Sequence, residues 1–214
     1  VADASYETTT EMKDLAELYA ENVKANYMSS YGGEYETYLV SDLQSLGYNS
    51  IDDLTTYFVN YQKTNQFLIE TVTDENDGTW NEYAKEKSPR VVSHILIKMA
   101  DPENPTDEEL AKVNAVNDAL ANGEEFGKVA AAHSEDSSAA TNGLLGYADA
   151  DTNYVEPFLK AMLTLEEGKT SEWVKTEYGY HLIKCDSTSV DYFIENYSED
   201  MLNAVLKFDP SVQP

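Results

Sequence analysis

The spacing of hydrophobic positions predicts that the N-terminal part of the chain is helical. Between residues 10 and 84, apolar side chains recur at steps of three and four residues, the period of an amphipathic helix. Gly32 and Gly47 end the first two patterns, and Ser50 with Asp53 resembles a capping box at the start of the third. The expected helices cover residues 10–28, 35–46, 50–72 and 80–84.

Beyond Pro89 the pattern changes and predicts strands. Residues 93–97 (SHILI) and 179–183 (GYHLI) each place a histidine among β-branched and apolar residues, which is typical of a strand buried on at least one face. Thr106 with Glu109 forms a capping box at the start of a helix. Strands are expected at 91–98, 143–147, 173–174 and 180–185, and helices at 106–122, 125–133 and 157–163.

A last apolar stripe predicts a C-terminal helix over residues 190–205. A single helix of this length is marginal in water, so it has to pack on another part of the chain. We expect it to pack on the N-terminal helices. The fold class is therefore α+β, with a helical part at residues 1–88, a strand-containing part at 89–187, and a C-terminal helix at 188–214 that returns to the helical part.

The charge of the chain narrows the classes of partner. Forty acidic and fourteen basic residues give a net charge of −26, which repels nucleic acid and anionic lipid. Such a surface favours cationic partners such as lysine-rich, partly unfolded chains, or it serves solubility alone; both interpretations stay open. No run reaches the ~20 apolar residues of a membrane span. Because the chain does not begin with methionine, we expect a processed or trimmed product, and any export signal or lipid anchor of the full gene would lie outside it.

Two further residue types bear on function. Cys185 is the single cysteine, which excludes an intramolecular disulfide, and its apolar strand predicts a buried core thiol. The N-terminal helices are rich in tyrosine, which combines apolar area with a polar tip. These tyrosines form either a core or a groove for extended, non-native chains, and periodicity does not decide between the two.

The order of motifs in residues 91–186 resembles a parvulin-type peptidyl-prolyl cis-trans isomerase domain. The resemblance rests on the two histidine strands, the helix 126–133 followed by Ser134, the DSSA run at 136–139, the NGLLG run at 142–146, and Phe158. Helical segments on both sides resemble exported foldases of the PrsA and SurA type. The resemblance implies a four-stranded antiparallel sheet surrounded by helices, inserted in or flanked by an all-helical chaperone-like domain.

The resemblance also assigns roles to residues. It implies that the strand histidines lie beneath the active site and that an acidic residue and a threonine join them. An apolar pocket receives the proline ring, with Tyr154 at a position where methionine is common. The implied catalytic residues are His94, Asp136, His181 and Thr176, and the implied substrate-binding residues are Leu145, Tyr154 and Phe158. No cofactor and no metal are expected.

Two departures from the family pattern affect the expected activity. The family usually has GGDLG where this chain has NGLLG, so Leu144 replaces an acid. The sequence does not decide the geometry of this loop. The loop 99–104 carries acids instead of a basic cluster, which argues against selectivity for phosphoserine-proline. We therefore expect a peptidyl-prolyl isomerase and foldase for exported proteins, with X-Pro polypeptide clients, outside the cytoplasm. The rivals are a binding-only chaperone with an inactive isomerase scaffold and a surface-display module.

Other roles remain possible for several of these residues besides the roles in an isomerase site. Strand histidines are often hydrogen-bonded core residues. A zinc site from His94, His133 and His181 lacks ligand spacing, and Ser134 lacks the surroundings of a hydrolase nucleophile. Asp149 and Asp151 could pair as in a glycosidase, although a solvated loop is the favoured interpretation. The carboxyl of Asp136 either disfavours the planar amide of the substrate or is protonated.

Overall fold

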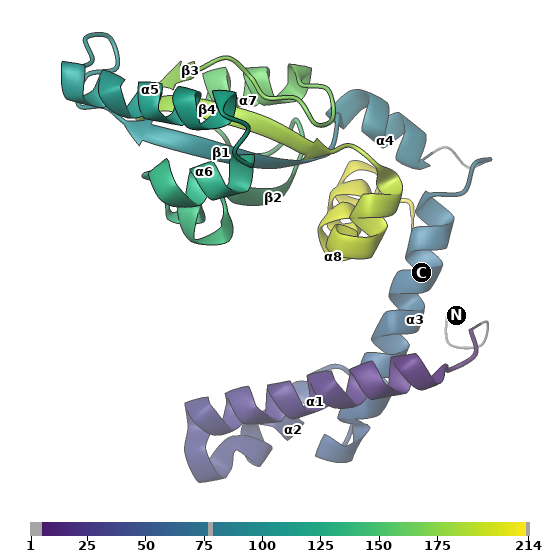
Figure 1. Ribbon diagram of the computed structural model, residues 1–214. Helices are drawn as coiled ribbons and strands as arrows, with labels where there is room; N and C mark the ends of the chain where they lie inside the picture. Colours follow the sequence, from purple (N-terminus) through teal and green to yellow (C-terminus); the bar gives the residue numbers. More distant parts are fainter. Residues whose placement is uncertain (1–5, 77–78, 213–214) are drawn as a thin grey trace. The chain divides into compact units, whose positions relative to one another are not determined.

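The computed structural model describes residues 6–76 and 79–212 (Figure 1). These residues form two compact units, one made of residues 6–76 with 209–212 and one of residues 79–208. The predicted α+β class is confirmed, with a four-stranded sheet confined to the second unit. None of the helices in the described ranges is long and apolar enough to cross a membrane.

The first unit is helical, as its hydrophobic period predicts. Thr9 accepts a hydrogen bond from the Met12 N–H and so caps the first helix, and Ser50 with Asp53 forms the expected capping box. Its core is a small cluster of Ala20, Leu39, Leu43 and Leu54. The elements are α1 (Thr10–Tyr31), the 3-10 turn η2 (Gly32–Glu34), α2 (Tyr35–Ser45), η3 (Ile51–Asp53) and α3 (Leu54–Val72).

The second unit contains the sheet, whose strands run in the order β2-β1-β4-β3 with every neighbouring pair antiparallel. The expected strands are all present, although β3 begins one residue later than its pattern. The elements are α4 (Thr79–Lys87), β1 (Arg90–Lys98), α5 (Asp107–Ala121), α6 (Phe126–His133), η4 (Ser137–Thr141), β2 (Leu144–Ala148), α7 (Glu156–Thr164), β3 (Val174–Thr176), β4 (Gly179–Ser187) and α8 (Val190–Phe208).

Helices cover both faces of the sheet, which explains why its central strands are apolar on both sides (Figure 1). Ile95, Ile97 and Leu182 pack with residues of α5 and α6 in one core cluster. On the opposite face, Val92 and Ile183 pack with Phe158 and Met162 of α7. Since side chains alternate between faces, His94 and His181 lie on the α7 side. The capping box of Thr106 and Glu109 at the start of α5 is confirmed.

Buried Arg90 ties the first strand to α7. Its guanidinium donates to the carbonyl oxygens of Met162 and Leu165 at 2.7 and 2.9 Å, so it satisfies acceptors at the C-terminal end of α7. Burial lowers the pKa of this guanidinium. The contact fixes the helix that presents Phe158 to the histidine face.

The C-terminal helix packs within the second unit. Phe193 of α8 is fully buried, and its ring lies 5.9 Å from that of Trp80 on α4 and 5.1 Å from that of Tyr147 on β2. Helix α4, which the pattern analysis groups with the N-terminal helices, thus shares a core with α8 and the sheet. The division into residues 1–88, 89–187 and 188–214 stays a prediction.

Candidate active site

The two strand histidines form a stacked, buried pair on the α7 face of the sheet. His94 lies on β1 and His181 on β4, in the diagonal positions that the register of the two strands creates. Their rings lie 5.4 Å apart with an interplanar angle of 22°, and their Nδ1 atoms are 3.3 Å apart. Each residue is 5% exposed. The pair therefore sits beneath the surface, where burial favours the neutral imidazole.

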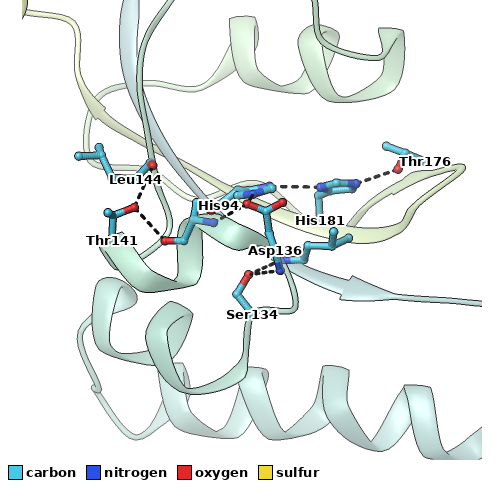
Figure 2. Close-up of polar contacts among 9 residues, drawn as sticks. His94, Ser134, Asp136, Thr141, Leu144, Thr176 and His181 are labelled. Atoms are coloured by element: carbon cyan, nitrogen blue, oxygen red, sulfur yellow. Dashed lines mark hydrogen bonds and ion pairs between the residues drawn. The ribbon is translucent and has the colours of Figure 1, made fainter. Parts of the chain in front are cut away.

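Thr176 and Asp136 extend this pair into a chain of polar contacts (Figure 2). The Thr176 Oγ1 atom lies 2.7 Å from Nε2 of His181, and Asp136 Oδ1 lies 3.2 Å from Nε2 of His94. The buried His94 Nε2 atom makes no hydrogen bond of good geometry among the described residues, so its contact with Asp136 is electrostatic. The structure brings together all four side chains of the implied catalytic set.

The protonation states of the chain follow from its surroundings. Burial, followed by the neighbouring His94, lowers the pKa of His181 to about 4, and burial lowers the pKa of His94. Both rings are neutral at pH 7 as a result. The Tyr178 N–H donates to Thr176 Oγ1, whose hydroxyl keeps its own proton to donate and a second lone pair to accept with. The Asp136 carboxylate near His94 Nε2 favours a proton on that nitrogen, and this choice makes Thr176 the donor to His181 Nε2. His181 Nδ1–H then donates to His94 Nδ1, and the remaining His94 Nε2–H faces the carboxylate of Asp136.

Asp136 is held as a carboxylate at the edge of the histidine pair. Burial opposes its ionisation, but the Ser138 hydroxyl and backbone N–H and the nearby His94 outweigh burial and lower the pKa. The Ser138 N–H donates to Asp136 Oδ1 at 2.8 Å, because Asp136 is the N-cap of η4. If the hydrogen bonds of the histidine pair ran in the opposite direction, His94 Nε2 would be unprotonated. Its lone pair would then face this carboxylate, which is unfavourable.

The segment that carries Asp136 is fastened to β1. Ser134 Oγ accepts from the Leu96 N–H at 3.1 Å, and the Glu135 N–H donates to the Leu96 carbonyl at 2.8 Å. Gly143 closes the segment against the same strand, since its carbonyl accepts from the His94 N–H at 2.8 Å. Gly143 has φ 81°, and a Cβ there would lie 2.5 Å from the His94 carbonyl oxygen. Only glycine fits this approach.

The apolar side of the site is built around Phe158. Its ring, only 3% exposed, meets the rings of His94 and His181 edge-on at 5.6 and 5.3 Å, and the Tyr154 ring lies 5.0 Å away. Leu145 completes the wall from β2. These side chains enclose a pocket of about 240 Å³ that is open to His94, Asp136 and His181. An apolar ring with a few polar groups at its edge is the kind of ligand that such a pocket receives.

Three lining residues were not predicted from the sequence. Asn153 and Val155 come from the loop between β2 and α7, and Tyr178 comes from the turn between β3 and β4. Tyr178 also lines an adjoining hollow of about 400 Å³ with Leu96, Lys98 and Met99. Tyr178 is 56% exposed, so its apolar ring at the mouth of a pocket is the signal that could have found it.

The structure separates the alternative sites from this one. Ser134 serves as an acceptor for β1, and within residues 6–76 and 79–212 no cluster of three metal-ligating side chains occurs. Asp149 is 7% exposed and accepts a hydrogen bond from Tyr83, so the expected solvated loop is wrong for Asp149. The reason is the packing of α4 beneath this loop, which the local sequence does not reveal.

Leu144, which replaces the family's acid, points away from the pocket. It is 41% exposed on the edge strand β2, while its neighbour Leu145 lines the pocket from the other face. Asn142 takes the left-handed conformation with φ 58° and leads into Gly143. The NGLLG run thus keeps the glycine and the pocket-facing leucine.

Comparisons with known proteins place the site in a family. Residues 94–187 match the family model described as Rotamase, PPIC-type PPIase domain. A foldase protein PrsA of Clostridium botulinum is 43% identical over 97 residues, which are 45% of this chain and 26% of that protein. The foldase protein PrsA 3 of Bacillus cereus is 34% identical over 146 residues, 67% of this chain and 46% of that protein. The chain therefore spans about half, or less, of the length of these relatives.

One solved structure has the same extent as the matched domain. The solution structure of NmPin, the parvulin of Nitrosopumilus maritimus, is 37% identical with a TM-score of 0.37, and covers 46% of this chain and 96% of that one. The match to the family model and the similarity to the two foldases confirm the resemblance inferred from the motifs. Residues 94–187 form a domain of the PPIC-type PPIase family, the parvulins, within a chain that is similar to PrsA foldases.

Proposed function

We propose that the chain is a peptidyl-prolyl cis-trans isomerase that acts as a foldase on polypeptides outside the cytoplasm. The observation that carries the proposal is the pocket of about 240 Å³ in which the Phe158 ring meets a neutral histidine pair and the Asp136 carboxylate. Similarity to proteins named PrsA foldases supports the foldase role.

The reaction suits a site without a nucleophile. Rotation about the X-Pro bond breaks no covalent bond, and its barrier is the loss of amide resonance. Uncatalysed isomerisation takes roughly 10 to 100 s at 25 °C, which limits folding. A site that binds the twisted amide better than either planar form accelerates the reaction. An acceleration of ~10⁴-fold requires about 5.5 kcal/mol of such preference.

The apolar wall of the pocket binds the substrate, and its polar edge supplies this preference. Phe158, Leu145 and Tyr154 hold the proline ring, while the amide that precedes it reaches the polar edge. In the planar amide the carbonyl oxygen carries more negative charge than in the twisted form, because resonance is lost on twisting. The Asp136 carboxylate therefore disfavours the planar form more than the twisted one. Its lowered pKa favours this role over that of a protonated donor.

The histidine pair and Thr176 keep this charge in place. The series of contacts from Thr176 through His181 to His94 favours a proton on His94 Nε2, the ring nitrogen that lies 3.2 Å from Asp136 Oδ1. In that arrangement the neutral His94 ring keeps its proton on Nε2 and Asp136 stays a carboxylate, so the negative charge at the pocket edge is preserved. We assign a tuning role to His94, His181 and Thr176, and substrate contact to Asp136 and the apolar wall.

The partners that we propose are unfolded or partly folded chains with X-Pro bonds, and the acidic charge of −26 attracts lysine-rich ones. Localisation at a bacterial cell surface or in a secreted form, with a lipid anchor outside residues 1–214, belongs to the same proposal. The exposed side chain of Leu144 does not enter the pocket, which supports an active site despite the altered motif.

The test is the isomerisation rate of a blocked Ala-Ala-Pro-Ala peptide, measured by NMR exchange with the full chain. Wild type should accelerate exchange. Asp136→Ala should lower kcat by about 10- to 100-fold, because the planar amide of the bound peptide is no longer disfavoured. The exposed Asp14→Ala on α1 should match wild type. An absence of acceleration by wild type would refute the proposed function. Equal rates for wild type and Asp136→Ala would refute the proposed site.

A further inference from the structure

The loop between β2 and α7, residues 149–155, carries part of the proline pocket without belonging to the sheet. Asn153, Tyr154 and Val155 line the pocket from this loop. Its first residue, Asp149, organises the turn: Oδ1 accepts from the Asp151 N–H at 2.8 Å and from the Thr152 hydroxyl at 3.3 Å. The position of Tyr154 therefore depends on how Asp149 is held.

Asp149 is held from behind by α4. The Tyr83 hydroxyl donates to Asp149 Oδ2 at 2.7 Å and lies 2.9 Å from the Tyr147 hydroxyl. Since the Tyr83 proton goes to the carboxylate, the Tyr147 hydroxyl donates to Tyr83. Tyr83 is 1% exposed and Asp149 is 7% exposed, so water does not replace a lost partner without rearrangement. Burial, followed by contacts with Tyr147 and Asp149, raises the pKa of Tyr83.

The last residue of α4 adds two further ties to the same loop. The Ala150 N–H donates to the Lys87 carbonyl at 2.8 Å, and Lys87 Nζ lies 3.2 Å from Asp151 Oδ1. The same ammonium lies 5.8 Å from the centre of the Phe208 ring on α8. The loop is thus fastened to α4, the first helix of the second unit, and Lys87 links it in turn to α8, the last one.

We propose that Tyr83 and Asp149 are positioning residues that set the place of Tyr154 at the proline pocket and so couple substrate binding to α4. The proposal rests on the proposed function for its substrate, a proline peptide. Tyr154 holds the ring in the planar and the twisted forms alike, so the coupling acts on binding more than on the chemical step.

Tyr83→Phe in the full chain is the first test, because it removes one hydroxyl and keeps the ring that packs on Trp80 and Phe208. The Kd for blocked Ala-Ala-Pro-Ala, from NMR titration, should rise about 3- to 10-fold, the factor for one net hydrogen bond. The change in kcat should stay below about 2-fold, as expected for lost uniform binding. Tyr192→Phe, on the exposed part of α8, is the matched control and should leave both unchanged.

Amide hydrogen exchange gives a readout that does not depend on activity. In Tyr83→Phe the amides of Ala150 and Asp151 should exchange faster, while the His94 amide, bonded to Gly143 within the sheet, should keep its wild-type rate. Asp149→Asn serves as the second variant and should change Kd and exchange in the same direction.

Three results would overturn the coupling. An unchanged Kd in both variants would do so, as would unchanged exchange at Ala150 and Asp151. Equal acceleration of exchange at His94 and in the loop would also do so, because it would mean general loosening of the unit. A wild-type protein that binds the peptide without accelerating its isomerisation would refute the proposed function alone, since Kd and exchange still test the coupling.

Discussion

The helical unit and the sheet unit use their hydrophobic residues differently. In α1, with 22 residues, only Ala16 and Ala20 are buried, whereas eight of the nine residues of β1 are buried. The helical unit also leaves large apolar side chains exposed, among them Leu18, Tyr19, Met28, Tyr31, Tyr38, Leu46 and Tyr61. The sheet unit therefore buries more of its side chains, and local changes there should have larger effects on stability.

Tyrosine shows the same difference. In the helical unit the Tyr27 hydroxyl donates to Asp42 at the surface, where water can replace either partner. In the sheet unit Tyr83 is buried and its hydroxyl is fixed between Tyr147 and Asp149. The helical pattern that contains each residue is similar, so the burial of its polar end distinguishes a structural tyrosine from a surface one.

The largest expected effect is that of Gly143→Ala, for which Gly33→Ala in the helical unit is the matched control. The new Cβ at residue 143 would lie 2.5 Å from the His94 carbonyl and 2.8 Å from Ala130 Cβ, at a φ of 81°. We expect a loss of roughly 3 kcal/mol or more in the free energy of unfolding, from overpacking and backbone strain. Gly33 has open space around it, so its variant should change stability by less than about 1 kcal/mol.

Urea unfolding measures this pair of variants. Tryptophan fluorescence follows Gly143→Ala in the sheet unit, because Trp80 and Trp173 both lie there, and far-UV circular dichroism follows Gly33→Ala in the helical unit. Equal stability of Gly143→Ala and wild type would contradict the close approach of the loop to β1.

The second effect is acid destabilisation of the sheet unit. Burial lowers the pKa of His181 to about 4 from an ordinary 6.5, so below pH 6.5 the unfolded chain binds a proton that the folded unit does not. Stability should therefore fall as the pH falls from 6.5 toward 4, by roughly 3 kcal/mol for the full shift. Below that window, the lowered pKa of Asp136 adds a further loss as its carboxylate becomes protonated.

Unfolding followed by tryptophan fluorescence at pH 7 and pH 5 measures the histidine contribution. His181→Asn should reduce the dependence on pH between these values, and a change of the half-exposed His133 to Asn should preserve it. A wild-type stability that is flat between pH 7 and pH 5 would rule out a neutral, buried His181.

A smaller effect is expected for Thr176→Val, paired with Thr71→Val on α3. Thr176 is 6% exposed, and its loss leaves His181 Nε2 without its hydroxyl partner. The expected cost is about 1 to 3 kcal/mol, with lower kcat because the histidine chain is no longer aligned. The Thr71 hydroxyl donates to the Phe67 carbonyl of its own helix, so its removal should cost less than about 0.5 kcal/mol. Equal costs in thermal unfolding would contradict the difference between the units.

The smallest effect is expected for Leu144→Asp, which restores the acid usual in the family. Because Leu144 is 41% exposed on an edge strand, stability should change by less than about 0.5 kcal/mol. By the same reasoning, the rate of isomerisation should stay within about 2-fold of the wild-type rate. Leu145→Asp on the opposite face is the contrast and should abolish binding of the proline peptide. A large rate increase in Leu144→Asp would show that the native site lacks an essential acid.

Much of the sheet unit could be predicted from the sequence, because its signals are local. The capping box of Thr106 and Glu109, the histidine strands and the glycine of the NGLLG run each depend on residues a few positions apart. The pairing of His94 with His181 follows once the strands are adjacent. All seven residues named for the site from the family pattern lie at or directly behind the pocket, although their roles stay predictions.

The remaining features depend on contacts between distant segments. Tyr178 reaches the pocket from a hairpin turn, and Tyr83 meets Asp149 across 66 positions of the sequence. Hydrophobic periodicity does not predict such long-range contacts, because it indicates which face of a helix is buried and not which element covers that face. The partner of α8 could not be identified for the same reason: its apolar face would suit the N-terminal helices as well as it suits α4 and β2.

The order of the strands has a consequence for the evolution of the chain. Val91 at the start of the sheet segment pairs with Ser187 at its end, so the two ends of this segment lie side by side, roughly 5 Å apart as neighbouring strands do. A segment whose ends already meet can be inserted into a host protein, or deleted from it, with little cost in loop-closure entropy. The PPIC-type domain therefore has the geometry of a single insert, whose removal would leave two chain ends close enough to be joined between α4 and α8.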